Sequence, residues 1–164
     1  MDQGCSKLKK YTGRQRILTQ LKFITILMCV LFQISFLNAG PLEAEIFTLT
    51  NQMREKAGLN PLQVNSHLME VAKSQSSIMA LEHTLSHSVK GDLVSRINRS
   101  RYSYRLIGEN IAESSTPNVN VVQLWMTSDG HRENILNPTY KDIGIGIAVS
   151  SDGVTYYTQV FGSQ

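Results

Sequence analysis

The chain has 164 residues and a formal net charge of +3 at neutral pH, and its length suits one domain. The basic excess lies at the N-terminus, because from residue 40 onward the chain has 10 Lys and Arg against 12 Asp and Glu. The larger part of the chain therefore lacks the clustered basic charge by which proteins contact nucleic-acid phosphates. We expect no nucleic-acid partner.

Residues 1–39 differ from the rest of the chain and have the pattern of an export signal. Basic residues precede the apolar run FITILMCVLFQISFL (23–37), and small residues follow it, which is the order found in secretory signal peptides. The run is short for a membrane-spanning helix, which needs roughly 20 apolar residues. An uncleaved N-terminal membrane anchor is the alternative, because Leu37 and Ala39 form an imperfect cleavage site before Gly40. Either reading predicts a secreted or cell-envelope domain that contacts a membrane only through this segment, if it is retained.

Both cysteines, Cys5 and Cys29, fall within that segment. The remaining part of the chain therefore has no thiol for a disulfide, a cysteine nucleophile or a thiolate metal site. A core of about 120 residues can be stable without such cross-links.

Two amphipathic helices are predicted after the export segment. The first lies in PLEAEIFTLTNQMREKAGLNP (41–61) and ends near Gly58, before a proline. Its apolar residues recur at helical spacing, namely Ile46, Leu49, Met53 and Ala57. The second lies in NSHLMEVAKSQSSIMAL (65–81), where Ser66 is the expected N-cap and Gln75 is the one polar residue on the apolar face.

Two shorter helices are predicted further along the chain. One spans residues 93–97, and the other lies in PNVNVVQLWMTS (117–128) with Pro117 at its start. The segment between them, LIGENIAESS (106–115), is short and flanked by turn formers. No helix or strand is predicted there.

The C-terminal part changes to the period of a strand. Isoleucines alternate with small residues in DIGIGIAVS (142–150), Ser151-Asp152-Gly153 predicts a hairpin turn, and VTYYTQVFG (154–162) suits the partner strand. The glycines of the first strand leave one face low, so that a helix can pack closely on it. Helices followed by an antiparallel hairpin indicate an α+β fold.

One pair of histidines has the spacing of a known metal motif. His83 and His87 stand four residues apart in HTLSH, as in the zinc-protease pattern His-Glu-x-x-His. Thr84 replaces the glutamate that serves as general base, so a metalloprotease is not favoured. We expect His83 and His67 to be ordinary surface or helix-face histidines.

Five ordered blocks resemble the CAP superfamily, also called the SCP domain, of cysteine-rich secretory, antigen 5 and pathogenesis-related 1 proteins. The blocks are LSHS (85–88), LIGENIA (106–112), LWMTSDGHRENILNP (124–138), IGIGIA (143–148) and YYTQVFG (156–162). The resemblance is nearest to the cysteine-free bacterial branch and covers about residues 43–164. It implies a three-layer α-β-α sandwich around a small antiparallel sheet, with a cleft lined by histidines and acidic residues.

The resemblance assigns three residues of this chain to the cleft. By motif, His87 takes the first histidine position, Glu109 the acid of GEN and His131 the second histidine. Other family members have a second acid in the pattern Trp-x-x-Glu, whereas Ser128 stands three residues after Trp125 here. A mechanism that needs two carboxylates is therefore not favoured.

The chemistry of these three residues leaves alternatives open. Two imidazoles and a carboxylate suit a divalent metal such as zinc, with one coordination position open, or an acid/base pair without metal. They could instead form a buried polar network that links loops to helices. Asn110 is expected to hold a loop backbone, with a ligand contact as the alternative, and Ser128 to line the cleft.

Further residues are expected to be structural or solvated. Trp125, Tyr156 and Tyr157 are predicted to be core aromatic residues. A local basic cluster is expected to face solvent, with contact to an anionic surface as the alternative. The cluster consists of Arg96, Arg99, Arg101 and Arg105.

Three classes of function are compatible with this sequence. The favoured one is a non-enzymatic extracytoplasmic binding module for a surface ligand, a lipid or a partner protein. The alternatives are a metal-dependent or acid/base hydrolase acting on peptide or envelope polymers, and an envelope-associated structural or stress protein. The missing second acid favours a role without catalysis. The resemblance in fold does not by itself choose among the three classes, because a fold alone does not define a function.

Overall fold

The structure, a computed structural model, describes residues 40–117 and 119–164. The predicted export segment and both cysteines lie outside these residues. The chain divides into the units Met1–Gly40 and Pro41–Gln164, and the fold below is that of the second. Within the described residues, none of the helices has the length and apolarity needed to span a bilayer.

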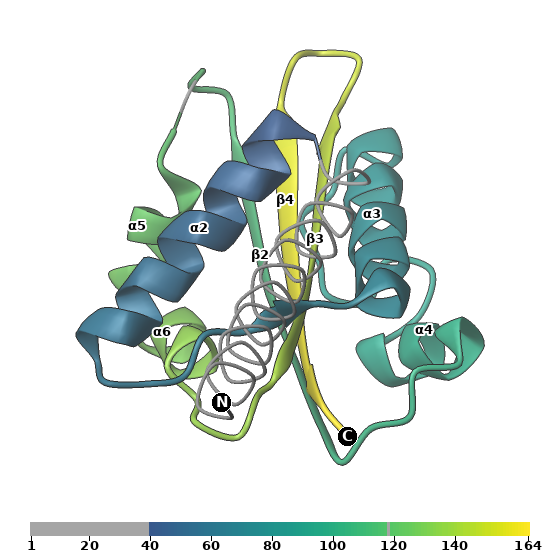
Figure 1. The fold of residues 1–164 in the computed structure, drawn as a ribbon. Helices are drawn as coiled ribbons and strands as arrows, with labels where there is room; N and C mark the ends of the chain where they lie inside the picture. Colours follow the sequence, from purple (N-terminus) through teal and green to yellow (C-terminus); the bar gives the residue numbers. More distant parts are fainter. Residues whose placement is uncertain (1–39, 118) are drawn as a thin grey trace, which may run out of the picture. The chain divides into compact units, whose positions relative to one another are not determined.

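Residues 41–164 form three layers (Figure 1). A four-stranded sheet with strand order β1-β3-β4-β2 stands in the middle. Helices α2, α5 and α6 cover one face, and α3 and α4 cover the other (Figure 1). The helices are α2 (Pro41–Lys56), α3 (Ser66–Leu81), α4 (Leu93–Ser100), α5 (Val121–Met126) and α6 (Asp129–Ile135). The predicted α-β-α sandwich is confirmed.

The sheet contains the predicted hairpin and two strands that the sequence did not reveal. Strands β3 (Asp142–Val149) and β4 (Thr155–Ser163) form the hairpin, and β2 (Leu106–Ser114) pairs antiparallel with β4 along its whole length. The two-residue β1 (Gln63–Val64) runs parallel to the start of β3. A parallel edge therefore joins a sheet that was predicted to be antiparallel throughout.

Helix α3 lies directly on the glycines of β3, as predicted. A Cβ added to Gly144 would lie 2.0 Å from the carbonyl carbon of Leu68, and one added to Gly146 would lie 2.1 Å from the carbonyl oxygen of Ala72. Four helical residues advance about 6 Å and two strand residues about 6.6 Å, so the two contacts repeat in register. The backbones of α3 and β3 touch because these two side chains are absent.

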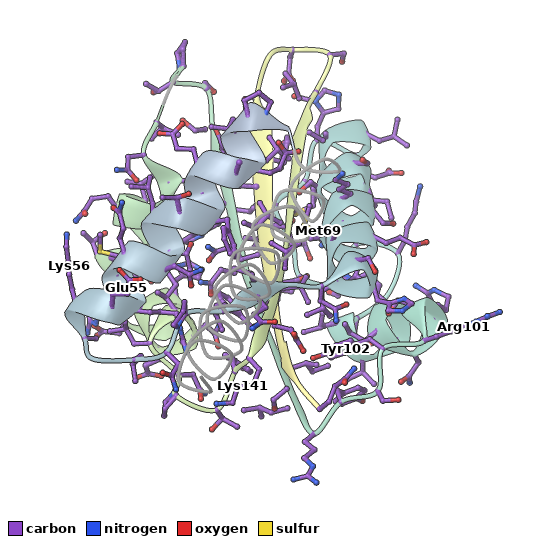
Figure 2. All side chains as sticks on the ribbon, in the orientation of Figure 1. Glu55, Lys56, Met69, Arg101, Tyr102 and Lys141 are labelled. Atoms are coloured by element: carbon purple, nitrogen blue, oxygen red, sulfur yellow. The ribbon has the colours of Figure 1, made fainter. Side chains whose placement is uncertain are left out.

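Side chains of α3 complete this contact. Figure 2 shows Met69 directed from α3 toward the sheet, where its sulfur accepts a hydrogen bond from the backbone N–H of Ile145 (3.1 Å). The helix is capped by Asn65, whose side-chain oxygen accepts from the backbone N–H groups of His67 (3.0 Å) and Leu68 (3.4 Å). The prediction of Ser66 as N-cap was wrong by one residue, because asparagine caps a helix as well as serine does.

The helix that carries the single tryptophan is shorter than predicted. It begins at Val121, and the side-chain oxygen of Asn120 accepts a hydrogen bond from the N–H of Gln123 (3.0 Å). The prediction that Pro117 starts this helix was therefore wrong, since a capping side chain nearer the apolar residues sets the boundary. In contrast, α4 extends beyond the predicted 93–97 to Ser100.

The predicted core aromatic residues are buried. Trp125, Tyr156 and Tyr157 are each exposed by 3% or less. The indole N–H of Trp125 donates to the carbonyl of Ile111 in β2 (3.2 Å). This bond satisfies the polar atom of a buried indole and fixes α5 against the sheet.

Arg54 of α2 is fully buried and is bound by backbone carbonyl groups. Its guanidinium donates to the carbonyls of Ile135 (2.7 Å) and Asn137 (2.9 Å) and, through Nε, to that of Asn60 (2.9 Å). The carbonyl of Tyr140 lies 3.5 Å from Nη2. Burial lowers the pKa of Arg54. The end of α6 and the segment after it are thus joined to the first helix.

Candidate functional site

Glu109 lies near the middle of β2, with its side chain only 3% exposed. Its Oε2 accepts a hydrogen bond from Nη2 of Arg96 at 2.5 Å, and its Oε1 lies 2.9 Å from Nδ1 of His87. A neutral His87 with the proton on Nδ1 donates to this oxygen. Both oxygens of the carboxylate therefore have a partner.

Arg96 reaches Glu109 from α4, and its side chain is only 4% exposed. Its Nη1 donates to the side-chain oxygen of Gln75 in α3 and to the carbonyl of His87 (3.2 Å). Gln75 in turn donates to the carbonyl of Ser86 (2.7 Å). The buried ion pair thus joins α3, α4 and β2 to the loop after α3, and its extra hydrogen bonds are what a buried pair needs to offset desolvation.

His87 is the exposed member of this group. It lies in the loop between α3 and α4, and its side chain is 58% exposed although Nδ1 is bound to Glu109. The other ring nitrogen, Nε2, is left for solvent or a ligand. A buried carboxylate therefore orients an accessible imidazole.

His131 comes from the opposite side of the sheet, in α6, and is half-buried. Burial lowers the pKa of His131, and the charge of His87 lowers it further. The structure brings His87 and Glu109 into direct contact. His131 is linked to the same strand through its backbone, because its carbonyl accepts a hydrogen bond from Asn110, the residue after Glu109.

Asn110 holds the segment around His131 in place. It is fully buried, and its Nδ2 donates to the carbonyl of His131 (3.1 Å) and to the side-chain oxygen of Gln159 (3.2 Å). Asn134 of α6 donates to the side-chain oxygen of Asn110 (2.9 Å) and to the carbonyl of Glu109 (3.2 Å). This is the backbone-holding role that the sequence favoured for Asn110.

Ser128 stands at the turn between α5 and α6 and is half-buried. Its carbonyl accepts from the N–H of Arg132 (2.8 Å), while its hydroxyl makes no capping hydrogen bond within the described chain. The adjacent Asp129 is mostly exposed and pairs with Arg132 (2.6 Å). Asp129 is therefore engaged by Arg132 and does not replace the acid that other family members have at the position of Ser128.

The environment of Glu109 acts on its charge in two directions. Burial raises the pKa of the carboxyl group, and the charge of Arg96 and the hydrogen bond and charge of His87 lower it. With a guanidinium at 2.5 Å, the ionised form has a strong partner. The charge of Arg96 thus offsets part of the cost of burying the Glu109 carboxylate.

The observed contacts of His87 and Glu109 differ from those of a preformed metal site. No group of three His, Cys, Asp or Glu side chains with the geometry to hold a metal ion occurs within residues 40–117 and 119–164. Each oxygen of Glu109 already accepts a hydrogen bond, which leaves it fewer lone pairs for a metal. Zinc binding by His87, Glu109 and His131 stays a prediction.

The HTLSH pair is not a helical metal motif. Helix α3 ends at Leu81, and His83 lies beyond it with a left-handed φ of 48°. Its Nδ1 pairs with Asp152 (3.2 Å) and its Nε2 lies 3.3 Å from the hydroxyl of Ser151. His83 therefore contacts the β3–β4 turn, whereas His87 contacts Glu109.

The sequence missed two residues of the site, Arg96 and Gln75. Arg96 was expected to face solvent with the other arginines of its cluster, and this was wrong because Glu109 and Gln75 bind it in the interior. The signal that could have found the network was Gln75, a polar residue on an otherwise apolar helix face, which implied a polar partner.

The chain matches the family described as CAP, the cysteine-rich secretory protein family, over residues 47–161. The chain belongs to the CAP family. Its resemblance in sequence is therefore confirmed, and the site described above is that of a CAP domain.

Several bacterial CAP-domain proteins are similar to this chain. The uncharacterized Bacillus subtilis protein YkwD is 36% identical over 121 residues, which are 73% of this chain and 46% of YkwD. An extracellular Bacillus anthracis protein containing an SCP domain is 33% identical with a TM-score of 0.66, over 74% of this chain and 40% of that protein. An outer surface protein of Borrelia burgdorferi is 25% identical with a TM-score of 0.69, over 76% of this chain and 94% of that one.

These relatives differ in length from the present chain. The chain spans less than half of YkwD and of the Bacillus anthracis protein, and nearly all of the Borrelia protein. The two solved relatives are described as extracellular and outer-surface proteins. Similarity therefore covers the CAP domain itself.

Proposed function

We propose that this CAP-domain protein works outside the cytoplasm as a non-enzymatic binding module. Its cleft, formed by His87, Glu109 and His131, would recognise a surface ligand, a lipid or a partner protein. This proposal rests on the two hydrogen bonds of the Glu109 carboxylate, one from Arg96 to Oε2 and one with His87 at Oε1. The accessible group of the cleft is then an oriented imidazole, which can donate to or accept from a ligand.

The same observation argues against hydrolysis. A general base has to reach the proton that it removes, and Glu109 is buried with both oxygens occupied. Ser128 stands where other family members have a second acid. A purely structural role is less well supported, because His87 remains largely exposed.

One binding experiment separates the three classes of function. The purified full chain is labelled and mixed with isolated bacterial cell-wall and membrane fractions, and both bound protein and released fragments are measured. We expect saturable binding that is lost in the His87→Ala/His131→Ala double variant and kept in His83→Ala. Release of fragments that stops in Glu109→Gln would favour the hydrolase, and no binding by the parent chain would favour the structural role.

Export is the second part of this proposal, with residues 1–39 as a cleaved signal or a retained anchor. It is supported by the extracellular and outer-surface relatives and by the basic and apolar order of the segment. A reporter that is active only after export, fused after Gln164, should be active. Activity of a cytoplasm-only reporter at the same position would contradict export.

Zinc binding is tested by calorimetric titration of the full chain. We expect affinity no tighter than about micromolar, because both oxygens of Glu109 already accept hydrogen bonds, and weaker binding below about pH 6, where protons compete for imidazole. His87→Ala and His131→Ala should each lose most of the binding, whereas His83→Ala should keep it. Nanomolar affinity would contradict the ion pair of Arg96 and Glu109 as described, and no binding at all would remove metal from the proposal.

A further inference from the structure

The C-terminal end of α3 and the turn between β3 and β4 lie at one end of the domain (Figure 1), where they bring a histidine, an aspartate and a serine together. Nδ1 of His83 lies 3.2 Å from Oδ1 of Asp152, and Nε2 of His83 lies 3.3 Å from the hydroxyl of Ser151. A neutral imidazole has one donor and one acceptor nitrogen, so Nδ1 can donate to Asp152 while Nε2 accepts from Ser151. This is the order of hydrogen bonds in the triad of a serine hydrolase.

Further contacts hold the aspartate and the histidine of this group in place. The hydroxyl of Ser150, a buried residue, donates to Asp152 (2.5 Å). This hydrogen bond lowers the pKa of Asp152, so the carboxylate is ionised at neutral pH and can hold a proton on Nδ1 of His83. The backbone of His83 has a left-handed φ of 48°, and the N–H of the next residue, Thr84, donates to the carbonyl of Met79 (3.0 Å). The end of α3 therefore positions the imidazole, and the carboxylate orients it.

A groove opens beside the histidine and the serine. Its volume is about 330 Å³, which is within the range of small-molecule sites. His83 and Ser151 both line it, together with apolar side chains from the ends of α3 and β3, namely Ala80, Leu81, Ala148 and Val149. Leu81 and Val149 are 71% and 64% exposed, the highest values among the large apolar side chains of the described residues. An acyl chain bound in the groove would remove apolar surface of both from water, which is favourable.

The turn also has a backbone donor for the negative charge that develops on the carbonyl oxygen of an ester under attack. The hydrogen bond that closes the turn joins the N–H of Gly153 to the carbonyl of Ser150 (3.0 Å), so the N–H of Ser151 is not used to close it. In serine hydrolases the N–H of the nucleophile itself helps to stabilise the oxyanion. Ser151 can therefore supply both the attacking oxygen and a donor.

We propose that Ser151, His83 and Asp152 form a second site, which hydrolyses esters of short, uncharged acyl groups. Oγ of Ser151 attacks the ester carbonyl carbon and passes its proton to Nε2 of His83. The bond from that carbon to the leaving oxygen then breaks, and the alcohol leaves with the proton from His83. Water attacks the acyl-serine in the same way, which releases the carboxylic acid and restores the hydroxyl of Ser151. This activity goes beyond the binding function proposed for the cleft, with which the site shares no residue.

Hydrolysis of p-nitrophenyl butyrate by the purified full chain tests the proposal. We expect saturable release of nitrophenolate, with kcat/KM lower by about a hundredfold in Ser151→Ala and in His83→Asn. This is the low end of what a general base contributes, because the side chains of His83 and Asp152 are 45% and 59% exposed to water. Ser103→Ala and His67→Asn, at exposed positions, are the matched controls and should keep the rate of the parent. An unchanged rate in Ser151→Ala, or no hydrolysis by the parent, would overturn the proposal.

A fluorophosphonate reagent identifies the attacking oxygen. It transfers a phosphonyl group to an activated serine with loss of fluoride, and peptide mass spectrometry should find this group on Ser151. Labelling should be at least about tenfold slower in His83→Asn, which lacks the base, and in Asp152→Asn, which no longer holds the proton on Nδ1 of His83. Equal labelling of Ser151 and Ser103 in the parent would show that the hydrogen bond to His83 does not activate Ser151, and would overturn the site.

The length of the acyl chain tests the groove. We expect kcat/KM for p-nitrophenyl butyrate to exceed that for p-nitrophenyl acetate about fivefold, because the longer chain buries more apolar surface. Val149→Thr keeps the shape of the side chain but adds a hydroxyl, and it should remove this preference while the rate with the acetate ester changes little. Leu124→Gln, at an exposed apolar residue of α5, is the control and should keep the preference. A preference that persists in Val149→Thr would contradict the groove as the acyl site.

Discussion

The contact between α3 and β3 and the ion pair of Arg96 and Glu109 are both buried, yet they are built in opposite ways. At the first, two backbones touch because Gly144 and Gly146 have no side chains. At the second, long polar side chains from α3, α4 and β2 meet end to end between backbones that stay apart. The α3–β3 contact should tolerate no added atom, and the ion pair should tolerate no lost charge. Substitutions that add or remove such groups test this difference directly.

The largest effect is expected from breaking the buried ion pair of Arg96 and Glu109. Arg96→Met leaves the carboxylate of Glu109 buried without its guanidinium partner, which should lower the free energy of unfolding by about 3–5 kcal/mol. Adding Glu109→Gln to Arg96→Met should cost less than the sum of the single changes, because the two residues are coupled. Urea unfolding of the three variants measures both quantities.

The exposed pair of Arg132 and Asp129 is the control for that experiment. Arg132→Met removes a similar contact at the surface and should cost at most about 1 kcal/mol. A similar loss for Arg96→Met and Arg132→Met would show that burial does not set the contribution of an ion pair to the stability of this domain.

A somewhat smaller effect is expected from adding one methyl group beneath α3. Gly146→Ala places a Cβ against the backbone of Ala72, and the helix must move away, which should lower the free energy of unfolding by about 3 kcal/mol. Gly130→Ala is the control, because its Cβ would meet nothing within 4 Å in the described chain, and alanine is favoured over glycine in a helix by up to about 1 kcal/mol. Thermal midpoints that fall equally in both variants would contradict the close approach.

The smallest effect is a dependence of stability on pH through His131. Burial and the charge of His87 lower the pKa of His131 in the folded state, so the folded chain binds fewer protons than the unfolded chain. The stability that the neutral imidazole contributes is present above the unfolded pKa of about 6.5 and is lost as the pH falls from there through the lower pKa of the folded state. Because His131 is only half-buried, we expect less than about 1 kcal/mol.

His131→Asn should therefore flatten the fall in the free energy of unfolding between pH 7.5 and 5.5. His67→Asn, at an exposed position of α3, should leave the slope unchanged. Glu109 acts in the opposite direction, since burial raises its pKa, but it is present in all three proteins. A steeper fall in His131→Asn than in the parent would contradict the assigned sign.

Features with a local period could be predicted from the sequence. The alternation of isoleucine and glycine after Asp142 identified β3 and its low face, and Ser151-Asp152-Gly153 identified the turn. Strand β2 could not be recognised, because Glu109 and Asn110 are two adjacent polar residues that are both buried. Their burial follows from partners in other elements rather than from any pattern within the strand.

The site was predictable only as a set of positions. Family motifs pointed to His87, Glu109 and His131, but no motif named the group that binds the carboxylate. Which of four neighbouring arginines turns inward depends on Glu109, 13 residues away, and on Gln75, 21 residues away. Contacts over such separations come from packing between helices and the sheet, which local spacing does not encode.

Arg54 has a consequence for the order in which this domain can assemble. Its carbonyl partners beyond the α2–β1 loop lie 81 to 86 residues later in the chain, so a chain that emerges N-terminus first carries α2 long before they exist. Burying the guanidinium without them would leave a charge unpaired, which is strongly unfavourable. We therefore expect α2 to pack with Arg54 buried only after the residues around Tyr140 are present, which makes closure of this layer a late step in folding.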